Sequence, residues 1–164
     1  MVMTLQLPAD LALPDEAATQ ALGRAIAQAL GPGEAVCLFG PLGAGKSTLA
    51  RALVRALIRA LTTPDEDVPS PTFTLVQFYE GARLNVAHFD LYRLSSPDEA
   101  YEIGLDEALD EGAAVIEWPE RLEGRLPRDR LDIEIALPET GTEGRRARLV
   151  AHGAWKGRGF EFGS

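Results

Sequence analysis

Residues 40–47 have the sequence Gly-Pro-Leu-Gly-Ala-Gly-Lys-Ser and match the pattern Gly-x-x-x-x-Gly-Lys-Ser/Thr at every defined position. In proteins this pattern forms a loop that wraps backbone N–H groups around phosphates, and its glycines let the backbone turn tightly beside the ligand. Lys46 of such a loop reaches the β- and γ-phosphates of a nucleotide, and the Ser47 hydroxyl binds Mg²⁺. The stretch therefore predicts a nucleotide-binding α/β domain.

The residues on either side of this loop support the prediction. The apolar run Ala35–Phe39 predicts a short buried strand, and residues Lys46–Leu61 predict a helix with a leucine at every fourth position. A strand, a loop and a helix in this order point the helix N-terminus at an anion. The alternative, a glycine-rich turn that binds no ligand, is disfavoured because the motif has its expected context.

The nucleotide base is predicted from an absence in the sequence. Proteins that read guanine in such a fold use an Asn-Lys-x-Asp element. Asn85 is the only asparagine of the chain, and Val86 follows it. ATP is therefore favoured over GTP.

The composition is that of an ordinary globular protein of 164 residues, with 46% hydrophobic and 25% charged residues. We expect one domain over residues 1–156 and a frayed tail over residues 157–164. No apolar run reaches the length of a membrane span, and no signal peptide is evident, so a cytoplasmic location without membrane contact is expected. Cys37, the only cysteine, is expected to be a small buried hydrophobic residue.

The formal net charge is −9, whereas proteins that hold nucleic acid on their own surface are usually basic. Strong direct binding of RNA or DNA is therefore not expected. A local basic patch at Arg145, Arg146 and Arg148 remains open.

The remaining pattern alternates helices and strands early and shows antiparallel strands later. Helices are expected at Asp15–Leu30, Pro97–Glu102 and Leu105–Glu111, a helical turn at Pro119–Glu123, and strands at Thr72–Tyr79, Arg83–Phe89, Ala113–Ile116, Arg130–Leu137 and Arg146–Ala151, the first two as a hairpin. This order predicts a three-layer α/β P-loop domain with a mixed parallel and antiparallel sheet. Residues Thr62–Pro71 form a polar, proline-rich connection.

Hydrolysis or transfer of a phosphate needs a second acidic group besides the loop. Asp90 and Glu117 each follow a predicted strand, as Gly40 does, and the three residues meet at one edge if those strands are parallel. Either carboxylate could support Mg²⁺ or the attacking water. The alternatives are a turn cap for Asp90 and a surface carboxylate for Glu117.

Three further residues are candidates with a structural alternative. Thr72, at the end of the polar connection, could sense the γ-phosphate or Mg²⁺, or could simply follow a Ser-Pro turn. His88 is expected to be a packed structural residue rather than a proton carrier. Trp118 could stack near the site or belong to the core.

Taken together, the segments resemble the TsaE (YjeE) family over residues 8–151. The resemblance rests on Gly40–Thr48, Ser70–Val76, His88–Leu94 and Glu117–Glu120, with a similar opening at Leu13–Thr19. Pro41 and Ser47 differ from the residues usual in the family, and both differences keep the loop chemistry.

The resemblance implies a P-loop ATPase, weak alone, that needs ATP and Mg²⁺. It implies that the chain acts with the partner proteins TsaD and TsaB and meets tRNA only through them. TsaD transfers a threonylcarbamoyl group to the adenosine next to the tRNA anticodon (t6A). Ser47 and Glu117 would bind Mg²⁺, with Asp90 nearby, and Ser70–Thr72 would respond to the nucleotide. The catalytic set is Lys46, Thr72, Asp90 and Glu117, and the nucleotide-binding set is Glu16 on the adenine side with Gly43, Ala44, Gly45, Lys46, Ser47 and Thr48.

Two other functions remain open. A small-molecule P-loop kinase shares the loop and often has arginines in a lid, and Arg121, Arg125, Arg128 and Arg130 could form one or an exposed arginine-rich turn. A nucleotide-gated binding module, whose hydrolysis is incidental, is the other.

Overall fold

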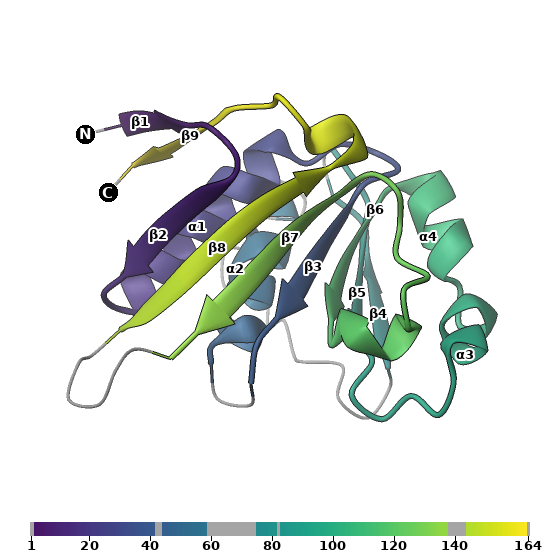
Figure 1. Cartoon of the computed structure of the whole chain (residues 1–164). Helices are drawn as coiled ribbons and strands as arrows, with labels where there is room; N and C mark the ends of the chain where they lie inside the picture. The colour runs from purple at the N-terminus through teal and green to yellow at the C-terminus, as the bar shows by residue number, and fades with distance from the viewer. Residues whose placement is uncertain (1, 42–43, 59–74, 82, 138–143, 164) are drawn as a thin grey trace.

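The computed structural model describes residues 2–41, 44–58, 75–81, 83–137 and 144–163. A seven-stranded sheet in the order β2-β8-β7-β3-β6-β5-β4 forms the middle of the molecule, and β1 and β9 pair in a separate ribbon (Figure 1). The elements are β1 (Val2–Leu5), β2 (Ala9–Leu13), α1 (Glu16–Ala29), β3 (Ala35–Phe39), α2 (Lys46–Ile58), β4 (Val76–Tyr79), β5 (Val86–Asp90), α3 (Pro97–Glu102), α4 (Leu105–Glu111), β6 (Ala113–Glu117), the 3-10 turn η1 (Pro119–Leu122), β7 (Arg130–Ala136), β8 (Arg145–His152), the 3-10 turn η2 (Gly153–Trp155) and β9 (Phe160–Gly163).

The sheet is mixed, as the sequence predicts. The central strands β7, β3, β6 and β5 are parallel to one another. At the two sides, β8 and β2 continue the sheet in antiparallel pairs, and β4 pairs antiparallel with β5. The expected hairpin is therefore confirmed as β4 and β5, and the parallel centre places several strand ends at one edge.

Two hydrophobic clusters pack against the two faces of the sheet and make three layers. Alternate residues of a strand point to opposite faces, so Val86 and Val115 join the cluster under α1 and α2, whereas Phe89 and Ile116 join the cluster under α3 and α4. Cys37 lies in the second cluster, is fully buried, and has a thiol pKa raised by that burial. It is a buried core residue, as expected.

Helix α1 shows why its sequence begins and ends a helix where it does. The Asp15 carboxylate accepts the N–H of Ala18 at 2.8 Å and caps the first turn. At the other end, the Arg83 guanidinium donates to the Leu30 carbonyl at 2.8 Å. In the middle, a Cβ added to Gly23 would lie 2.8 Å from the Cβ of Ala52, so glycine lets α1 approach α2 closely.

Most expected helices and strands agree with the structure within one to four residues. The helices predicted at Pro97–Glu102 and Leu105–Glu111 have those bounds in the structure. The helix predicted to reach Leu61 is described as far as Ile58, and its last residues lie outside the described part. The strand predicted from Thr72 is described from Val76, with residues 72–74 outside that part.

The two ends of the chain differ from the expectation. β1 and β2 were not expected, and the expectation of a frayed tail at 157–164 is corrected by β9, which pairs antiparallel with β1 and places Leu5 opposite Phe160. Trp155 is fully buried and meets Phe160 edge to face. The tail is held because its aromatic side chains complete the core beside α1.

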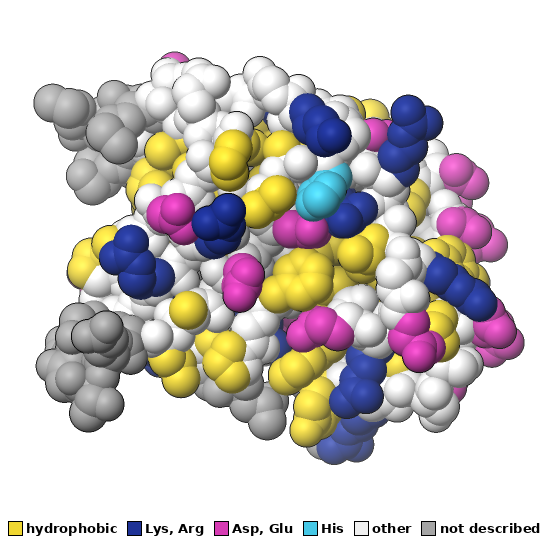
Figure 2. Space-filling view, in the orientation of Figure 1, with side chains coloured by type: hydrophobic (Ala, Val, Ile, Leu, Met, Phe, Trp, Pro, Cys, Tyr) yellow, Lys and Arg dark blue, Asp and Glu magenta, His cyan; other side chains and the backbone are white. Residues whose placement is uncertain are grey.

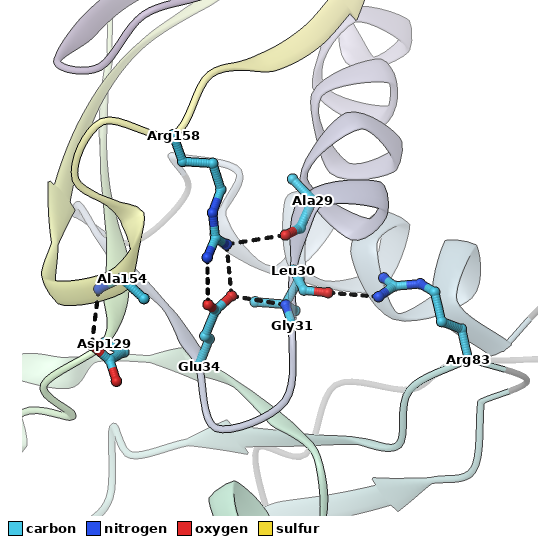
Figure 3. A network of polar contacts seen from close by, with 8 residues as sticks. All are labelled: Ala29, Leu30, Gly31, Glu34, Arg83, Asp129, Ala154 and Arg158. Atoms are coloured by element: carbon cyan, nitrogen blue, oxygen red, sulfur yellow. Dashed lines mark hydrogen bonds and ion pairs between the residues drawn. The ribbon is translucent and has the colours of Figure 1, made fainter.

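A polar network fixes this C-terminal segment to the end of α1 (Figure 3). The Arg158 guanidinium donates two hydrogen bonds to the Glu34 carboxylate, at 2.8 and 2.6 Å, and a third to the Ala29 carbonyl. It also stacks over the Trp155 ring at 4.5 Å. Glu34 in turn accepts the N–H of Gly31. One bidentate ion pair thereby joins α1, β3 and the chain end.

The face shown in Figure 2 has charged side chains of both signs in alternation. On the outer face of the sheet, Arg148 lies within 3.8 Å of Asp10, and it stands opposite Glu134. Arg148 thus lies between two carboxylates, whereas Arg146 stands opposite Ala12 and Ala136. In the described part of the chain, no helix has the length and apolar character that crossing a membrane requires.

Candidate phosphate and magnesium site

The parallel strands bring the predicted residues together at one edge. Asp90 and Glu117 end the neighbouring strands β5 and β6 and stand opposite each other, and Glu117 also stands opposite Leu38 of β3, just before the loop. Strand alternation points both carboxylates to the face covered by α2. Together they line a hollow of about 500 Å³ with Ala44, Gly45, Lys46, Ser47, Thr48, Tyr92, Arg93, Trp118 and Arg145.

Two loop glycines are needed for the backbone geometry. Gly40 has a φ of 145°, and a Cβ there would lie 2.5 Å from the Ile135 carbonyl oxygen. Gly45 has a φ of 101°, in the region that favours glycine, and α2 begins at the next residue. The helix N-terminus therefore opens into the hollow, where its unpaired N–H groups favour an anion. Gly43 lies outside the described residues.

Lys46 is held by the protein itself. Its Nζ donates to the Gly40 carbonyl at 2.5 Å and lies 3.2 Å from the centre of the Trp118 ring. Only 5% of the side chain is exposed, and this burial lowers the pKa of the ammonium, partly offset by Glu120 and Glu117. A bound phosphate would offer this desolvated cation a charged partner in place of a carbonyl.

Ser47, Glu117 and His88 form a hydrogen-bonded row at the floor of the hollow. The Ser47 hydroxyl donates to Glu117 Oε1 at 2.7 Å, and His88 Nε2 lies 2.6 Å from Oε2. Burial raises the pKa of Glu117, but the hydrogen bonds from His88 and Ser47 and the charge of Lys46 outweigh it, so the pKa is lowered overall. The surface alternative for Glu117 is excluded, because 2% of the residue is exposed.

His88 holds Glu117 and is itself fully buried. Its Nδ1 has no hydrogen-bond partner among the residues that the structure describes. With Nε2 bearing the proton, the imidazole fixes one carboxylate oxygen and leaves the other toward Ser47. His88 therefore positions Glu117 in addition to filling space in the core. The sequence did not indicate this contact because the two residues are 29 positions apart.

The donor atoms fit Mg²⁺. This ion prefers oxygen ligands in octahedral geometry and is commonly held by one or two carboxylates together with phosphates and water. The Ser47 hydroxyl and the Glu117 carboxylate are such ligands and already touch each other. Asp90 adds a second carboxylate to the lining, and its Oδ1 also accepts the Tyr92 N–H, so the turn-cap role is present as well.

Trp118 lies at the site rather than in the core alone. It has φ 60° and ψ 50°, a left-handed conformation that is uncommon for a bulky residue. This backbone places its ring against Lys46 and 4.9 Å from the Tyr92 ring, measured between centroids. The aromatic pair forms one wall of the hollow.

Arg145 is a lining residue that the sequence did not indicate as such. Its Nε donates to the Ala44 carbonyl at 3.1 Å, so the start of β8 supports the phosphate loop. The residues are 101 positions apart, and only the antiparallel addition of β8 to the sheet brings them together. In the sequence, Tyr92 and Arg93 were noted only as neighbours of Asp90, and both line the hollow in the structure.

A second hollow of about 340 Å³ continues from the loop toward α1. Its lining comprises Leu13, Pro14, Asp15, Glu16, Thr19, Gly45, Thr48, Gly144 and Arg145. Glu16 and Thr48, both predicted to bind the nucleotide, therefore line the same hollow. Thr72 lies outside the described residues.

Two of the arginines that a kinase lid would use are engaged elsewhere. Arg125 pairs with Asp98 at 2.5 Å, and Arg130 pairs with Asp132 at 3.0 Å. Arg121 lies 5.7 Å from the Tyr92 ring. None of the three lines the hollow around the phosphate loop.

The sheet order, the glycine loop and the helix that starts at Lys46 define an α/β domain of the P-loop class with a mixed sheet. Residues 13–147 match the family model described as "Threonylcarbamoyl adenosine biosynthesis protein TsaE". The chain belongs to this family, which takes part in the formation of threonylcarbamoyladenosine in tRNA.

Individual relatives agree with this assignment. The proteins named "tRNA threonylcarbamoyladenosine biosynthesis protein TsaE" include one from Aquifex aeolicus, 42% identical over 71% of this chain and 81% of its own length, and one from Bacillus subtilis, 34% identical over 85% of this chain and 82% of its own. The crystal structure of Bacillus subtilis YdiB superposes with a TM-score of 0.68 at 30% identity and covers 92% of this chain and 88% of that one. The resemblance seen in the sequence is confirmed.

Proposed function

We propose that this chain is a Mg²⁺-dependent ATPase that supports t6A formation by cycling a complex of TsaD and TsaB. The observation that carries the ATPase is the 2.7 Å contact between the Ser47 hydroxyl and Glu117, directly below the phosphate loop. A hydroxyl and a buried, ionised carboxylate at this place are the ligands that a nucleotide-bound Mg²⁺ requires.

The residues would divide the work as follows. The loop backbone and the N-terminus of α2 hold the phosphates, and Lys46 exchanges the Gly40 carbonyl for a phosphate oxygen. Ser47 and Glu117 would hold Mg²⁺, and the bound ion would supply positive charge to neutralise the phosphates. Asp90, the second carboxylate at the edge, orients the attacking water.

The family and the net charge of the chain support a proposal for what the energy of ATP hydrolysis acts on. With a net charge of −9 the chain is poorly suited to hold tRNA alone, so its contact with tRNA is expected to be indirect. The energy of hydrolysis would then act on protein partners, TsaD and TsaB, in the cytoplasm. The segment Thr62–Thr72 is proposed to couple nucleotide state to that association.

The test measures ATP hydrolysis by the chain alone and with the TsaB–TsaD pair. We expect weak hydrolysis alone and a change in rate with the pair. Lys46→Ala should abolish both, because the removed ammonium serves the phosphates. Lys156 is the only other lysine and is exposed, so Lys156→Ala is the matched control. Wild-type rates in Lys46→Ala would contradict the site.

The kinase alternative is separated in the same assay. A kinase consumes ATP in proportion to an added small acceptor, whereas this ATPase should ignore acceptors and respond to protein partners. The ion pairs of Arg125 and Arg130 favour the ATPase, because they leave those arginines committed to neighbouring carboxylates.

A further inference from the structure

A groove between α1 and α2 gathers three arginines beside the phosphate loop. Arg24 of α1 and Arg51 and Arg55 of α2 line a hollow of about 390 Å³, which we name the arginine groove. The rest of its lining is Glu16, Gln20, Thr48, Ala52 and Ala56.

The geometry of the two helices explains why the guanidinium groups meet. Helical residues four positions apart lie on one face, about 6 Å apart along the axis. Arg51 and Arg55 are such a pair on α2, and Gln20 and Arg24 are the facing pair on α1. Because Gly23 lets the helices approach closely, the three cations share one narrow surface.

Among the residues that the structure describes, these three arginines lack the acidic partner that several other arginines have. Elsewhere Arg125, Arg130 and Arg158 each pair with a carboxylate. Within the described part of the chain, no ion pair or hydrogen bond joins Arg24, Arg51 or Arg55 to a carboxylate. The one carboxylate in the lining, Glu16, accepts a hydrogen bond from Gln20.

Among the described residues, no carboxylate pairs with these three positive charges, although the protein is acidic. The chain has 25 acidic and 16 basic side chains, so carboxylate partners are abundant. Like charges one helical turn apart repel each other and disfavour the helix. The described part of the fold therefore gives no reason for this cluster, whereas an anionic ligand would remove the repulsion.

We infer that the arginine groove docks a short acidic segment of a partner protein. The inference rests on the proposed function only for the existence of such a partner. Two or three carboxylates of an extended or helical segment match three guanidinium groups. An RNA strand fits less well, because three arginines neutralise about three phosphates and the net charge of −9 repels a long polyanion.

The groove also adjoins the nucleotide site. Thr48 lines the arginine groove, the hollow around the phosphate loop and the hollow on the adenine side. A segment in the groove would therefore lie beside Thr48, which also borders the phosphate loop. We therefore expect the affinity of the groove for this segment to depend on the bound nucleotide.

The experiment measures binding of a fluorescent hexaglutamate peptide by anisotropy, at low ionic strength and at about 0.15 M salt. We expect the wild-type chain to bind the peptide and Arg24→Glu/Arg55→Glu to bind it about 10-fold more weakly or worse. Arg24→Gln/Arg55→Gln is the second variant and should be intermediate. Arg128→Glu, an exposed arginine outside the groove, should bind like the wild type.

Hexauridylate serves as the second probe. Tighter binding of hexauridylate than of hexaglutamate would overturn the inference in favour of RNA. Absence of hexaglutamate binding, or a loss in Arg128→Glu equal to that in the groove variants, would also overturn it.

The proposed function is tested separately by basal ATP hydrolysis. The groove variants should keep the basal rate and lose the effect of the protein partners on it. If no preparation hydrolyses ATP while hexaglutamate still binds through the groove, the proposed function fails and the docking site stands. If basal hydrolysis and the effect of the partners are both unchanged in the groove variants, the docking site is wrong and the ATPase stands.

Discussion

At the scale of single residues, Glu117 determines what the site can do. It is buried, it accepts a hydrogen bond from Ser47, and its lowered pKa keeps it ionised near neutral pH. Glu117→Gln keeps the shape and removes the charge. We expect ATP turnover to fall about 10²-fold while nucleotide still binds, because one positioned group is lost. The measurement is single-turnover hydrolysis together with calorimetry of nucleotide binding.

The control for this variant is Glu123→Gln, an exposed carboxylate that does not line the hollow. It should leave turnover unchanged. Normal Mg²⁺-dependent turnover in Glu117→Gln would transfer the role to Asp90, the other carboxylate at the sheet edge.

His88 holds the Glu117 carboxylate through Oε2, and we expect it to affect Mg²⁺ binding only through Glu117. His88→Ala removes the hydrogen bond to Oε2, and loss of such an outer partner commonly weakens a metal site about 10-fold or more. The Mg²⁺ concentration for half-maximal turnover should rise accordingly. His88→Gln can still donate from its amide and should recover part of the loss. An unchanged Mg²⁺ dependence in His88→Ala would mean that His88 only fills space.

The sequence predicted the site residues that carry local signals. Ser47 and Lys46 belong to a motif, and Asp90 and Glu117 follow apolar runs, so each could be proposed without the fold, and all four line the same hollow. Arg145 could not be found in this way, because its contact with the loop depends on how β8 joins the sheet.

At the scale of elements, the helices and strands with local sequence signals were predicted, and those without such signals were not. α3 follows a serine and has proline in its first turn, and α4 lies between two glycines, so both ends of each are marked. β1 and β9 have only four residues each, and each needs the opposite end of the chain as its partner. No local periodicity indicates such a pairing.

Helix α1 depends on its N-terminal cap, Asp15, which also lines the hollow between the phosphate loop and α1. Asp15→Ala removes the acceptor for the Ala18 N–H and should lower the free energy of unfolding by about 1 kcal/mol. Asp15→Asn keeps an acceptor oxygen and should lose much less. Urea denaturation of both variants is the measurement, and equal losses would show that the negative charge matters rather than the cap.

At the scale of the whole molecule, the first and last strands of the chain pair with each other beside the C-terminal end of α1. The β1–β9 ribbon packs its apolar side chains on the same cluster as α1 and α2. Arg158 then links this ribbon to Glu34, at the start of β3 (Figure 3). The strand that leads to the phosphate loop is therefore anchored at its other end by the C-terminal segment.

This ion pair should make stability depend on pH. Burial raises the pKa of Glu34, but the hydrogen bonds from Arg158 and Gly31 outweigh it, so the folded-state pKa lies below its ordinary value of 4.5. The carboxylate thus stabilises the fold above pH 4.5, and the contribution is lost as the pH falls through the lowered pKa. Glu34→Gln should cost about 1–2 kcal/mol at pH 7, since charged hydrogen bonds at a half-exposed arginine are lost.

The measurement is urea denaturation of wild type and Glu34→Gln from pH 7 down to acid. The gap between their free energies of unfolding should be constant above pH 4.5 and should close below it, because protonation removes the same charge from the wild type. Glu161→Gln, an exposed carboxylate in β9, should show no gap at pH 7. A gap for Glu34→Gln that persists unchanged into acid would assign the loss to packing of the amide, and the ion pair would then have no part in holding the chain end.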